Sequence, residues 1–125
     1  MKICVTSEGK SLDSPVDSRF GRCSNLIFFD TDTGGFEAQE NSGFQIQGGA
    51  GIQAGQLAVS KGVTAVLTGN VGPNAYRVLA SAGISVFTGV SGTVKEAIEG
   101  YRNGKYKAAE APSAALKSGA QVKNE

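Results

Sequence analysis

Two neighbouring stretches of this chain repeat the same order of residue types. Residues 62–72 run from a glycine through a short apolar segment to Thr-Gly, two further residues and another glycine, and residues 83–92 follow the same order. The first glycine of each stretch is typical of a helix end, the apolar segment of a buried strand, and the last glycine of the turn before a helix. Consecutive units of this kind predict parallel strands that are joined by right-handed crossovers.

The rest of the chain alternates between strand and helix patterns as well. Turn residues at 31–35 separate two strand patterns and so predict a hairpin. Thr93 and Glu96 have the spacing of a capping box, which predicts the start of a last helix. Because the hairpin needs one antiparallel strand, we expect an α/β domain with a mixed sheet and helices packed on it. Periodicity places the strands at 3–6, 25–30, 36–40, 63–67 and 84–87, and the first two helices at 52–61 and 75–82.

Length and charge limit the class of protein. A chain of 125 residues is long enough for one compact domain, which we place at residues 1–103. The periodic pattern ends near Gly104, so we expect residues 104–125 to form a mobile tail without chemistry. The net charge of +1 argues against a nucleic-acid partner. No apolar run approaches the ~20 residues that span a bilayer, and the N-terminus lacks a signal peptide, so we expect a cytoplasmic protein without a membrane partner.

The turn within the first repeat unit has the features of an anion-binding site. Gly69 and Gly72 let the backbone turn sharply and leave its amide groups uncovered. Pro73 suits the first position of a helix, because its ring fixes φ and the N–H that it lacks would be unpaired there. A strand, a bare turn and a helix N-terminus together favour a bound anion. No carboxylate, histidine or lysine interrupts the turn, so the sequence indicates binding rather than catalysis.

Two further segments should join this turn at the carboxyl end of the sheet, where open α/β sheets bind their ligands. One is the long connection 7–24, which contains Arg19 and Arg22, and the other is the segment 47–53, which opens the first helix. Helix N-termini and guanidinium groups both favour an anion. Two acidic residues of the connection oppose this interpretation, because they can pair with the arginines: Asp13 and Asp17.

The two cysteines are expected to be free thiols in a cytoplasmic protein. Cys4 lies in the middle of the first predicted strand and should belong to the core. Cys23 has two interpretations. Beside Arg22 and helix N-termini its thiolate would be favoured and could ligate a soft metal, but a lone cysteine next to a strand is also a common apolar filler. With no histidine and no Cys-x-x-Cys motif, the chain lacks the familiar ligands of a closed zinc site.

Residues 49–54 fit the dinucleotide fingerprint G-x-G-x-x-A. No clear buried strand precedes them, and no acidic residue lies near the offset of ~20 residues that would bind a ribose. We therefore interpret the glycines as a helix start that packs closely on the sheet and exposes amides to some other anion, and we expect no nucleotide cofactor.

Three motifs of the chain are considered together: SRFGRC at 18–23, GAGIQA at 49–54 and TGNVGPNA at 68–75. In this order they resemble the dinitrogenase iron–molybdenum cofactor biosynthesis family, which includes nitrogenase cofactor carriers and small stand-alone proteins. The resemblance extends from about residue 1 to about residue 101. It implies a ribonuclease H-like fold with a five-stranded mixed sheet, and non-enzymatic binding of an anionic metal–sulfur cluster: iron–molybdenum cofactor, its precursor or a molybdenum–copper sulfide. Some carriers of the family are described with a histidine at the cluster, and because this chain has none, direct ligation rests on Cys23 or does not occur.

We therefore expect a small carrier that binds such a cluster in cofactor assembly, with cofactor-assembly proteins as partners and no catalytic residue. Two alternatives remain: a regulatory or interaction module that binds a nucleotide or a protein, and a metal-dependent nuclease, which would need clustered carboxylates that the first strand lacks. The expected site combines apolar walls, charge, amide donors and, in Cys23, an exchangeable metal ligand. It consists of Arg19, Phe20, Gly21, Arg22, Cys23, Gly49, Gly51, Ile52, Asn70, Gly72, Pro73 and Asn74.

Overall fold

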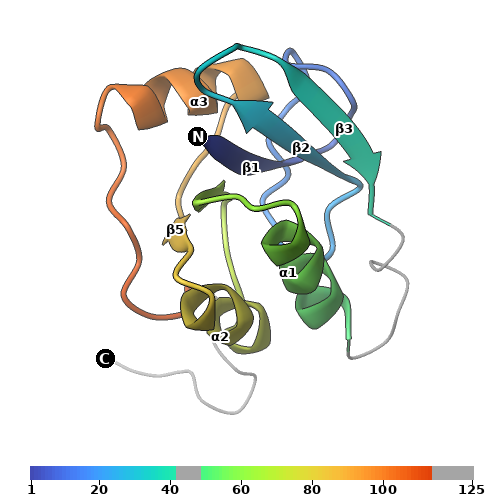
Figure 1. The fold of residues 1–125 in the computed structure, drawn as a ribbon, viewed down its shortest axis with the longest axis vertical. Coiled ribbons are helices and arrows are strands. Elements are labelled where there is room, and N and C mark those ends of the chain that lie inside the picture. The colour runs from blue at the N-terminus through green and yellow to red at the C-terminus, as the bar shows by residue number, and fades with distance from the viewer. Residues whose placement is uncertain (42–48, 114–125) are drawn as a thin grey trace.

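A computed structural model describes residues 1–41 and 49–113 of the chain. This part of the chain forms five strands and three helices that alternate after an initial hairpin (Figure 1). The elements are, in order, β1 (Lys2–Ser7), β2 (Asn25–Asp30), β3 (Phe36–Glu40), α1 (Ala50–Ser60), β4 (Ala65–Leu67), α2 (Pro73–Ser81), β5 (Ser85–Phe87) and α3 (Val94–Arg102).

The strands form one mixed sheet in the order β3-β2-β1-β4-β5. β2 is antiparallel to both of its neighbours, whereas β1, β4 and β5 are parallel to one another. The mixed five-stranded sheet with one reversed strand is therefore confirmed. The internal repeat is confirmed as two βα units as well, because its apolar runs become the neighbouring parallel strands β4 and β5, with Val66 opposite Val86.

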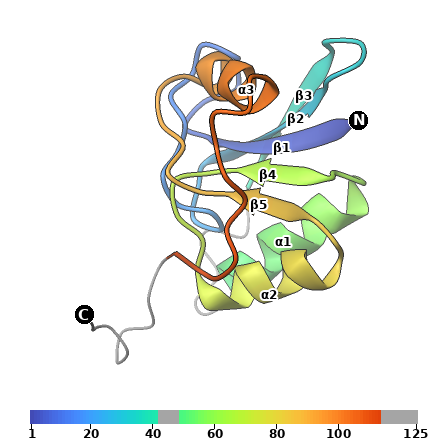
Figure 2. The ribbon, with the colours of Figure 1, turned by 90° about the vertical axis from the view of Figure 1, so that its left-hand side faces the viewer.

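Helices cover both faces of the sheet (Figure 2). α1 and α2 pack on one face, where the core includes Cys4, Phe28 and Val66. α3 covers the other face, where the core includes Ile3 and Leu67. Successive side chains of a strand point to opposite faces, so a sheet that is covered on both sides buries nearly every residue of its central strands. This explains why the strands appear in the sequence as continuous apolar runs, and Cys4 is fully buried, as predicted.

The ends of α1 and α2 are set by small residues. Gly62 (φ +74°) and Gly83 (φ +79°) follow the two helices in the left-handed conformation that is common at helix C-termini. Pro73 occupies the first turn of α2, as predicted. α1 begins at Ala50, earlier than the apolar pattern indicates, because its first turn is built from small residues that the pattern does not mark.

The segment that follows α3 differs from the expectation of a tail without structure. Residues 105–113 lie along β5 and α2, and the Ala109 N–H donates to the Val86 carbonyl oxygen (2.7 Å). The Tyr106 ring packs so closely against Gly100 that a Cβ there would lie 2.8 Å from it. The physical reason is that β5 is the last strand of the sheet, so its outer backbone groups need partners that another segment can supply. Residues 114–125 lie outside the described part of the chain.

Candidate functional site

The loop after β1 and the turn after β4 lie against each other at the carboxyl end of the sheet. Arg19 and Asn70 form a parallel bridge. The Phe20 N–H donates to the Asn70 carbonyl oxygen (3.0 Å), and the Asn70 N–H donates to the Ser18 carbonyl oxygen (2.7 Å). A Cβ on Gly69 would lie 2.7 Å from backbone atoms of Ser18, so only a glycine allows this approach. The predicted convergence of these two segments is confirmed.

The N-terminus of α1 completes the junction. Gly21 has φ +96°, and a Cβ on it would lie 2.8 Å from the Gly51 Cα. A Cβ on Gly51 would in turn lie 3.2 Å from the Ala75 Cβ, in the first turn of α2. The loop therefore contacts α1, and α1 contacts α2. Residues 47–48 of the segment predicted to open α1 lie outside the described residues.

These three segments surround a cavity of about 220 Å³. The sequence predicts every residue that lines it except Ala50 and Ala75, which are small and carry no chemical signal. The lining consists of Phe20, Arg22, Ala50, Gly51, Ile52, Gly72, Pro73, Asn74 and Ala75.

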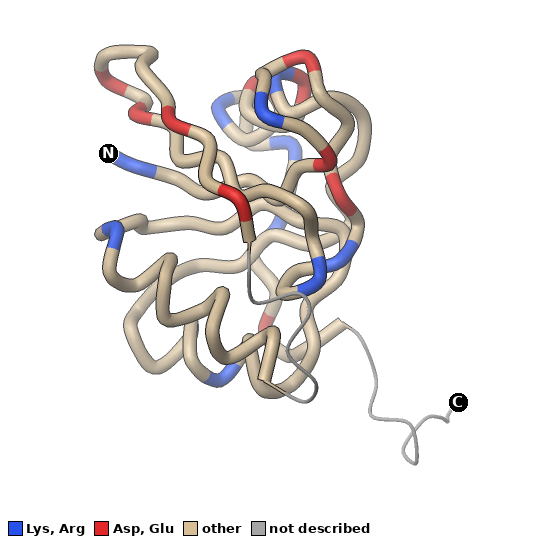
Figure 3. Tube along the Cα trace, turned by 90° about the vertical axis from the view of Figure 1, so that its right-hand side faces the viewer, with Lys and Arg blue, Asp and Glu red and all other residues tan. Residues whose placement is uncertain are grey.

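The two helices that begin at the cavity have uncapped N-termini. The N-cap residues of α1 and α2 are Gly49 and Gly72, neither helix start has a side-chain capping bond, and neither has an acidic residue in its first turn. α1 carries no charge along its whole length (Figure 3). By contrast, α3 begins away from the cavity with the complete capping box predicted from Thr93 and Glu96. Among the three helices of the described residues, the two that meet the cavity thus begin without a capping side chain on the amides that a helix start leaves without partners.

The two arginines of the loop differ in their surroundings. Arg22 lines the cavity, whereas Arg19 does not. The Arg19 Nε lies 3.5 Å from the Asp17 Oδ1, and the Asp17 side chain is 6% exposed. The same Asp17 oxygen accepts a hydrogen bond from the Arg19 N–H (3.1 Å). Pairing with an aspartate, one of the two possibilities left open by the sequence, therefore occurs at Arg19. Asp13 lines a different hollow beside α3.

Three further predicted residues support the cavity without lining it. Gly49 is the N-cap of α1, and Gly21 makes the close approach to Gly51. The side-chain amide of Asn70 donates to the Ser18 carbonyl oxygen (3.5 Å). It therefore bonds to the loop after β1 instead of serving as a donor in the cavity.

Cys23 belongs to the core cluster that also contains the lining residues Phe20 and Ala75, and its thiol is fully buried. Burial raises the pKa of Cys23 to about 12, and the Asp17 carboxylate acts in the same direction, while a hydrogen bond from the Asn41 side chain opposes them in part. Burial and the neighbouring Cys23 also raise the pKa of Cys4. Both cysteines are free thiols, as predicted. Cys23 is not among the residues that line the cavity, and its burial in the core favours the interpretation as an apolar filler over that as a metal ligand.

The burial of Cys23 predicts low reactivity. At pH 8, a thiol with a pKa of about 12 is ionised on the order of a thousandfold less than one in an unfolded chain. We therefore expect iodoacetamide to modify Cys23 at least a hundredfold more slowly in the native protein than in urea, as followed by peptide mass spectrometry. Rapid labelling of the native protein would contradict the buried position and would restore Cys23 as a candidate ligand.

Asn41 is a supporting residue that the sequence did not reveal. It is 3% exposed, and its side-chain amide donates to the carbonyl oxygens of Gly21 and Cys23 (both 2.9 Å). These bonds fix the turn that carries Arg22. No local pattern predicts them, because the partners are 18 and 20 residues apart in the chain. Asp17, which the sequence indicates as a possible partner of the arginines, also has the spacing of a common turn motif, because its carboxylate accepts from the N–H two residues later.

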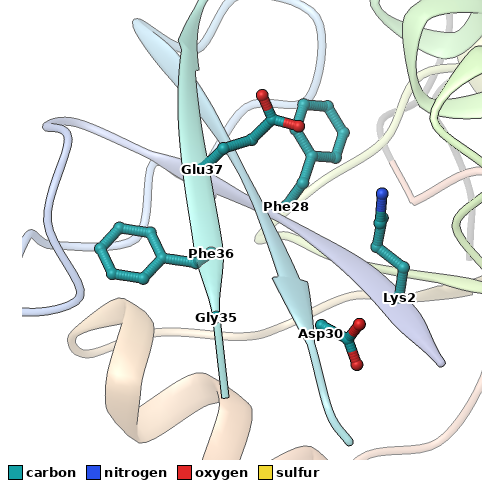
Figure 4. Close-up of a pocket in the computed structure, with 6 residues that line it drawn as sticks. All are labelled: Lys2, Phe28, Asp30, Gly35, Phe36 and Glu37. Atoms are coloured by element: carbon teal, nitrogen blue, oxygen red, sulfur yellow. The ribbon is translucent and has the colours of Figure 1, made fainter. Parts of the chain in front are cut away.

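A second hollow of about 220 Å³ lies beside the turn end of the β2–β3 hairpin (Figure 4). It contains the ammonium group of Lys2 together with the carboxylates of Asp30 and Glu37, and the Phe36 ring points away from the other side chains. No helix begins there, and the charges are of both signs. This hollow therefore lacks the features that distinguish the cavity at the helix N-termini.

The described residues contain neither a metal-binding cluster nor a helix that could span a membrane. Among residues 1–41 and 49–113, no group of three or more Cys, Asp, Glu or His side chains could hold a metal ion. Within the same residues, every helix falls short of the length and apolar character needed to cross a bilayer.

Comparison with known proteins gives consistent matches. A family model described as dinitrogenase iron-molybdenum cofactor matches residues 1–104. An uncharacterized protein of Methanocaldococcus jannaschii is 31% identical over 108 residues, which cover 84% of this chain and 88% of that protein. The apo form of the orange protein from Desulfovibrio gigas superposes with a TM-score of 0.88 at 36% identity, over 90% of this chain and 96% of that one. A NifB-like protein from Thermotoga superposes with a TM-score of 0.77 at 36% identity, over 94% of this chain and 98% of that one.

Proposed function

The chain belongs to the dinitrogenase iron-molybdenum cofactor family, and from this premise we propose that it binds and carries an anionic metal–sulfur cluster without catalysing a reaction. The cargo would be iron–molybdenum cofactor, a precursor or another sulfide of molybdenum, iron or copper. Family membership supports a general role in dinitrogenase cofactor biosynthesis or carriage. The protein would act in the cytoplasm, with cofactor-assembly proteins as its partners. We include the ribonuclease H-like assignment in the proposal, since the mixed sheet with one reversed strand is compatible with it.

The observation that carries the proposal is the pair of uncapped helix N-termini at one cavity. Each N-terminus favours negative charge by about 0.3–1 kcal/mol, and by up to about 2 kcal/mol where it is partly buried. Both α1 and α2 begin with a glycine and without an acidic residue, so neither a capping side chain nor a first-turn carboxylate competes with an anion for their amides. Arg22 adds a guanidinium group to the same lining. The sulfides of a polyanionic cluster would accept hydrogen bonds from both kinds of donor.

The remaining lining residues suit a large, polarizable cargo. Phe20 and Ile52 would provide apolar walls, and Asn74 would provide a side-chain amide. Because Cys23 is buried, the proposal requires no covalent bond between protein and cluster. A cargo that is bound through charge and hydrogen bonds can leave without breaking a metal–ligand bond, which suits a carrier.

Capping α2 with a carboxylate tests the proposal. Gly72 has φ −80° and ψ 173°, and a Cβ on it would contact nothing within 4 Å. An aspartate at an N-cap accepts a hydrogen bond from the first turn. It stabilises a helix by a few tenths of a kcal/mol more than a glycine does. We therefore expect Gly72→Asp to keep the melting temperature and to weaken the binding of tetrathiomolybdate by about tenfold or more.

Gly72→Ser is the matched control, because it caps the same amides without a charge. Its affinity in equilibrium dialysis should lie between those of the wild type and Gly72→Asp. Molybdate, the all-oxygen counterpart, tests whether the sulfides contribute. Wild-type affinity in the aspartate variant would mean that the anion does not contact the N-terminus of α2, and the proposal would fail.

A regulatory module that binds a nucleotide is the second candidate, since bare helix N-termini also suit phosphate groups. Equilibrium dialysis against nucleotides separates the two, because only this candidate predicts that a nucleotide displaces tetrathiomolybdate. The absence of catalysis belongs to the proposal as well, and a magnesium-dependent nuclease assay with single- and double-stranded substrates tests it.

A further inference from the structure

The segment 105–113 lies beyond the family match, which ends at residue 104, yet it contacts the element that forms the anion site. In both ribbon views this segment descends from the end of α3 past β5 to the start of α2 (Figures 1 and 2). Ala108 forms an antiparallel bridge with Phe87, which anchors the segment to the sheet. The residues that follow this anchor contact the start of α2, which lines the cavity.

Two contacts join the segment to the N-terminus of α2. Ser113 makes a reciprocal pair with Val71, in which the Ser113 N–H donates to the Val71 carbonyl oxygen (3.0 Å) and the Val71 N–H donates to the Ser113 Oγ (2.9 Å). The Tyr76 hydroxyl donates to the Ala109 carbonyl oxygen (3.2 Å). Both partners on the α2 side lie within the stretch 71–76, which contains the lining residues Gly72, Pro73, Asn74 and Ala75.

The pair with Val71 fixes the direction of an amide at the site. The Val71 carbonyl and the Gly72 N–H belong to one planar trans peptide, so they point in opposite directions and rotate together. Gly72 has no side chain that could hold this peptide in place, and Val71 is fully buried. A bond from Ser113 to the Val71 carbonyl oxygen therefore also orients the Gly72 N–H. The second bond, from the Val71 N–H to the Ser113 Oγ, fixes the preceding peptide.

We propose that Ser113 is a positioning residue for the anion site: the C-terminal segment holds the Gly69–Asn74 turn in the orientation that presents its amides to the cargo. The inference rests on the proposed function for its consequence, which is a dependence of cargo affinity on a residue that lies beyond the part of the chain that the family model matches. The positioning itself is a property of the protein without cargo.

The test uses the full chain with Ser113→Ala. This substitution removes the Oγ that accepts from the Val71 N–H and leaves the backbone bond to the Val71 carbonyl oxygen without its reciprocal partner. The loss of one hydrogen bond corresponds to about a two- to tenfold change. We expect a two- to tenfold weaker affinity for tetrathiomolybdate, faster hydrogen exchange of the Val71 amide and a shifted Gly72 amide resonance. Ser113→Thr keeps the hydroxyl and should restore all three values.

Ser81→Ala is the matched control, because it removes the same group from an exposed position at the other end of α2. It should leave the three values at those of the wild type. A lower melting temperature of Ser113→Ala with unchanged affinity would reduce Ser113 to a structural role and overturn the proposal. If the wild type does not bind tetrathiomolybdate, the proposed function fails. The Val71 exchange rate and the Gly72 resonance then decide the positioning alone, and unchanged values in Ser113→Ala overturn it.

Discussion

Replacing Gly21 with alanine should lower the free energy of unfolding by about 2–5 kcal/mol, the largest stability effect that we expect from a single methyl group in this chain. Two costs combine. The backbone at Gly21 has φ +96°, a conformation that costs an L-residue about 1–2 kcal/mol. The added Cβ would also lie 2.8 Å from the Gly51 Cα and 3.0 Å from its nitrogen, and overpacking of this kind costs about 1–3 kcal/mol. Urea denaturation measures the sum.

Gly34→Ala is the matched control for this effect. Gly34 has φ +79°, but a Cβ there would contact nothing within 4 Å. The control therefore carries the backbone cost without the contact, and its loss of stability should be about 1–2 kcal/mol. Equal losses in the two variants would mean that Gly21 and Gly51 do not touch in solution. The loop and α1 would then not form a common wall of the cavity.

Replacing Arg22 with alanine should weaken the binding of tetrathiomolybdate by about 10- to 100-fold. Hydrogen bonds to charged groups contribute about 1.5–3 kcal/mol, and each 1.4 kcal/mol is a factor of ten in affinity. Arg22 is the arginine that lines the cavity. Arg22→Lys should recover only part of the affinity, because an ammonium group keeps the charge but lacks the planar fork of donors. Equilibrium dialysis at two salt concentrations measures both variants.

Arg19→Ala removes the same charge from the same loop and provides the comparison. Because the Arg19 side chain pairs with Asp17 and does not line the cavity, we expect less than about a threefold change in affinity. The sequence assigned both arginines to the site, so this comparison separates the two. Equal losses in the two variants would show that long-range charge, and not direct contact, attracts the anion.

The fold could be predicted largely because local patterns determine it. Glycines and a proline mark the helix ends, and the repeated βα unit gives two parallel neighbours. The segment 105–113 could not be predicted, because it packs through backbone groups and one tyrosine instead of a periodic apolar face. The two repeat units also differ in how their helices begin. The second unit has a capped helix that begins after Thr93, whereas the first has the bare glycine Gly72.

The meeting of the three segments at one cavity could be predicted more reliably than the directions of their side chains. Glycines that must approach another backbone, such as Gly51 and Gly69, leave a clear mark in the sequence. The direction of a side chain in an irregular loop leaves none. Arg19 and Arg22 are three positions apart and look equivalent, yet Arg19 pairs with the buried Asp17 and Arg22 lines the cavity. The sequence likewise leaves two interpretations of Cys23 open, because the loop that buries it also depends on Asn41, which is distant in the chain.

The C-terminal segment also determines where a foreign strand could extend this sheet. Ala108 pairs with Phe87, so the flank formed by β5 is already occupied by the chain itself. At the opposite flank, β3 pairs only with β2 within the described residues. Its Glu37 and Glu40 are exposed, and each forms an ion pair with a lysine, Lys61 and Lys10 respectively. Within the described residues, strand addition at the β5 flank is thus blocked by the chain itself, which protects this edge from association with another sheet.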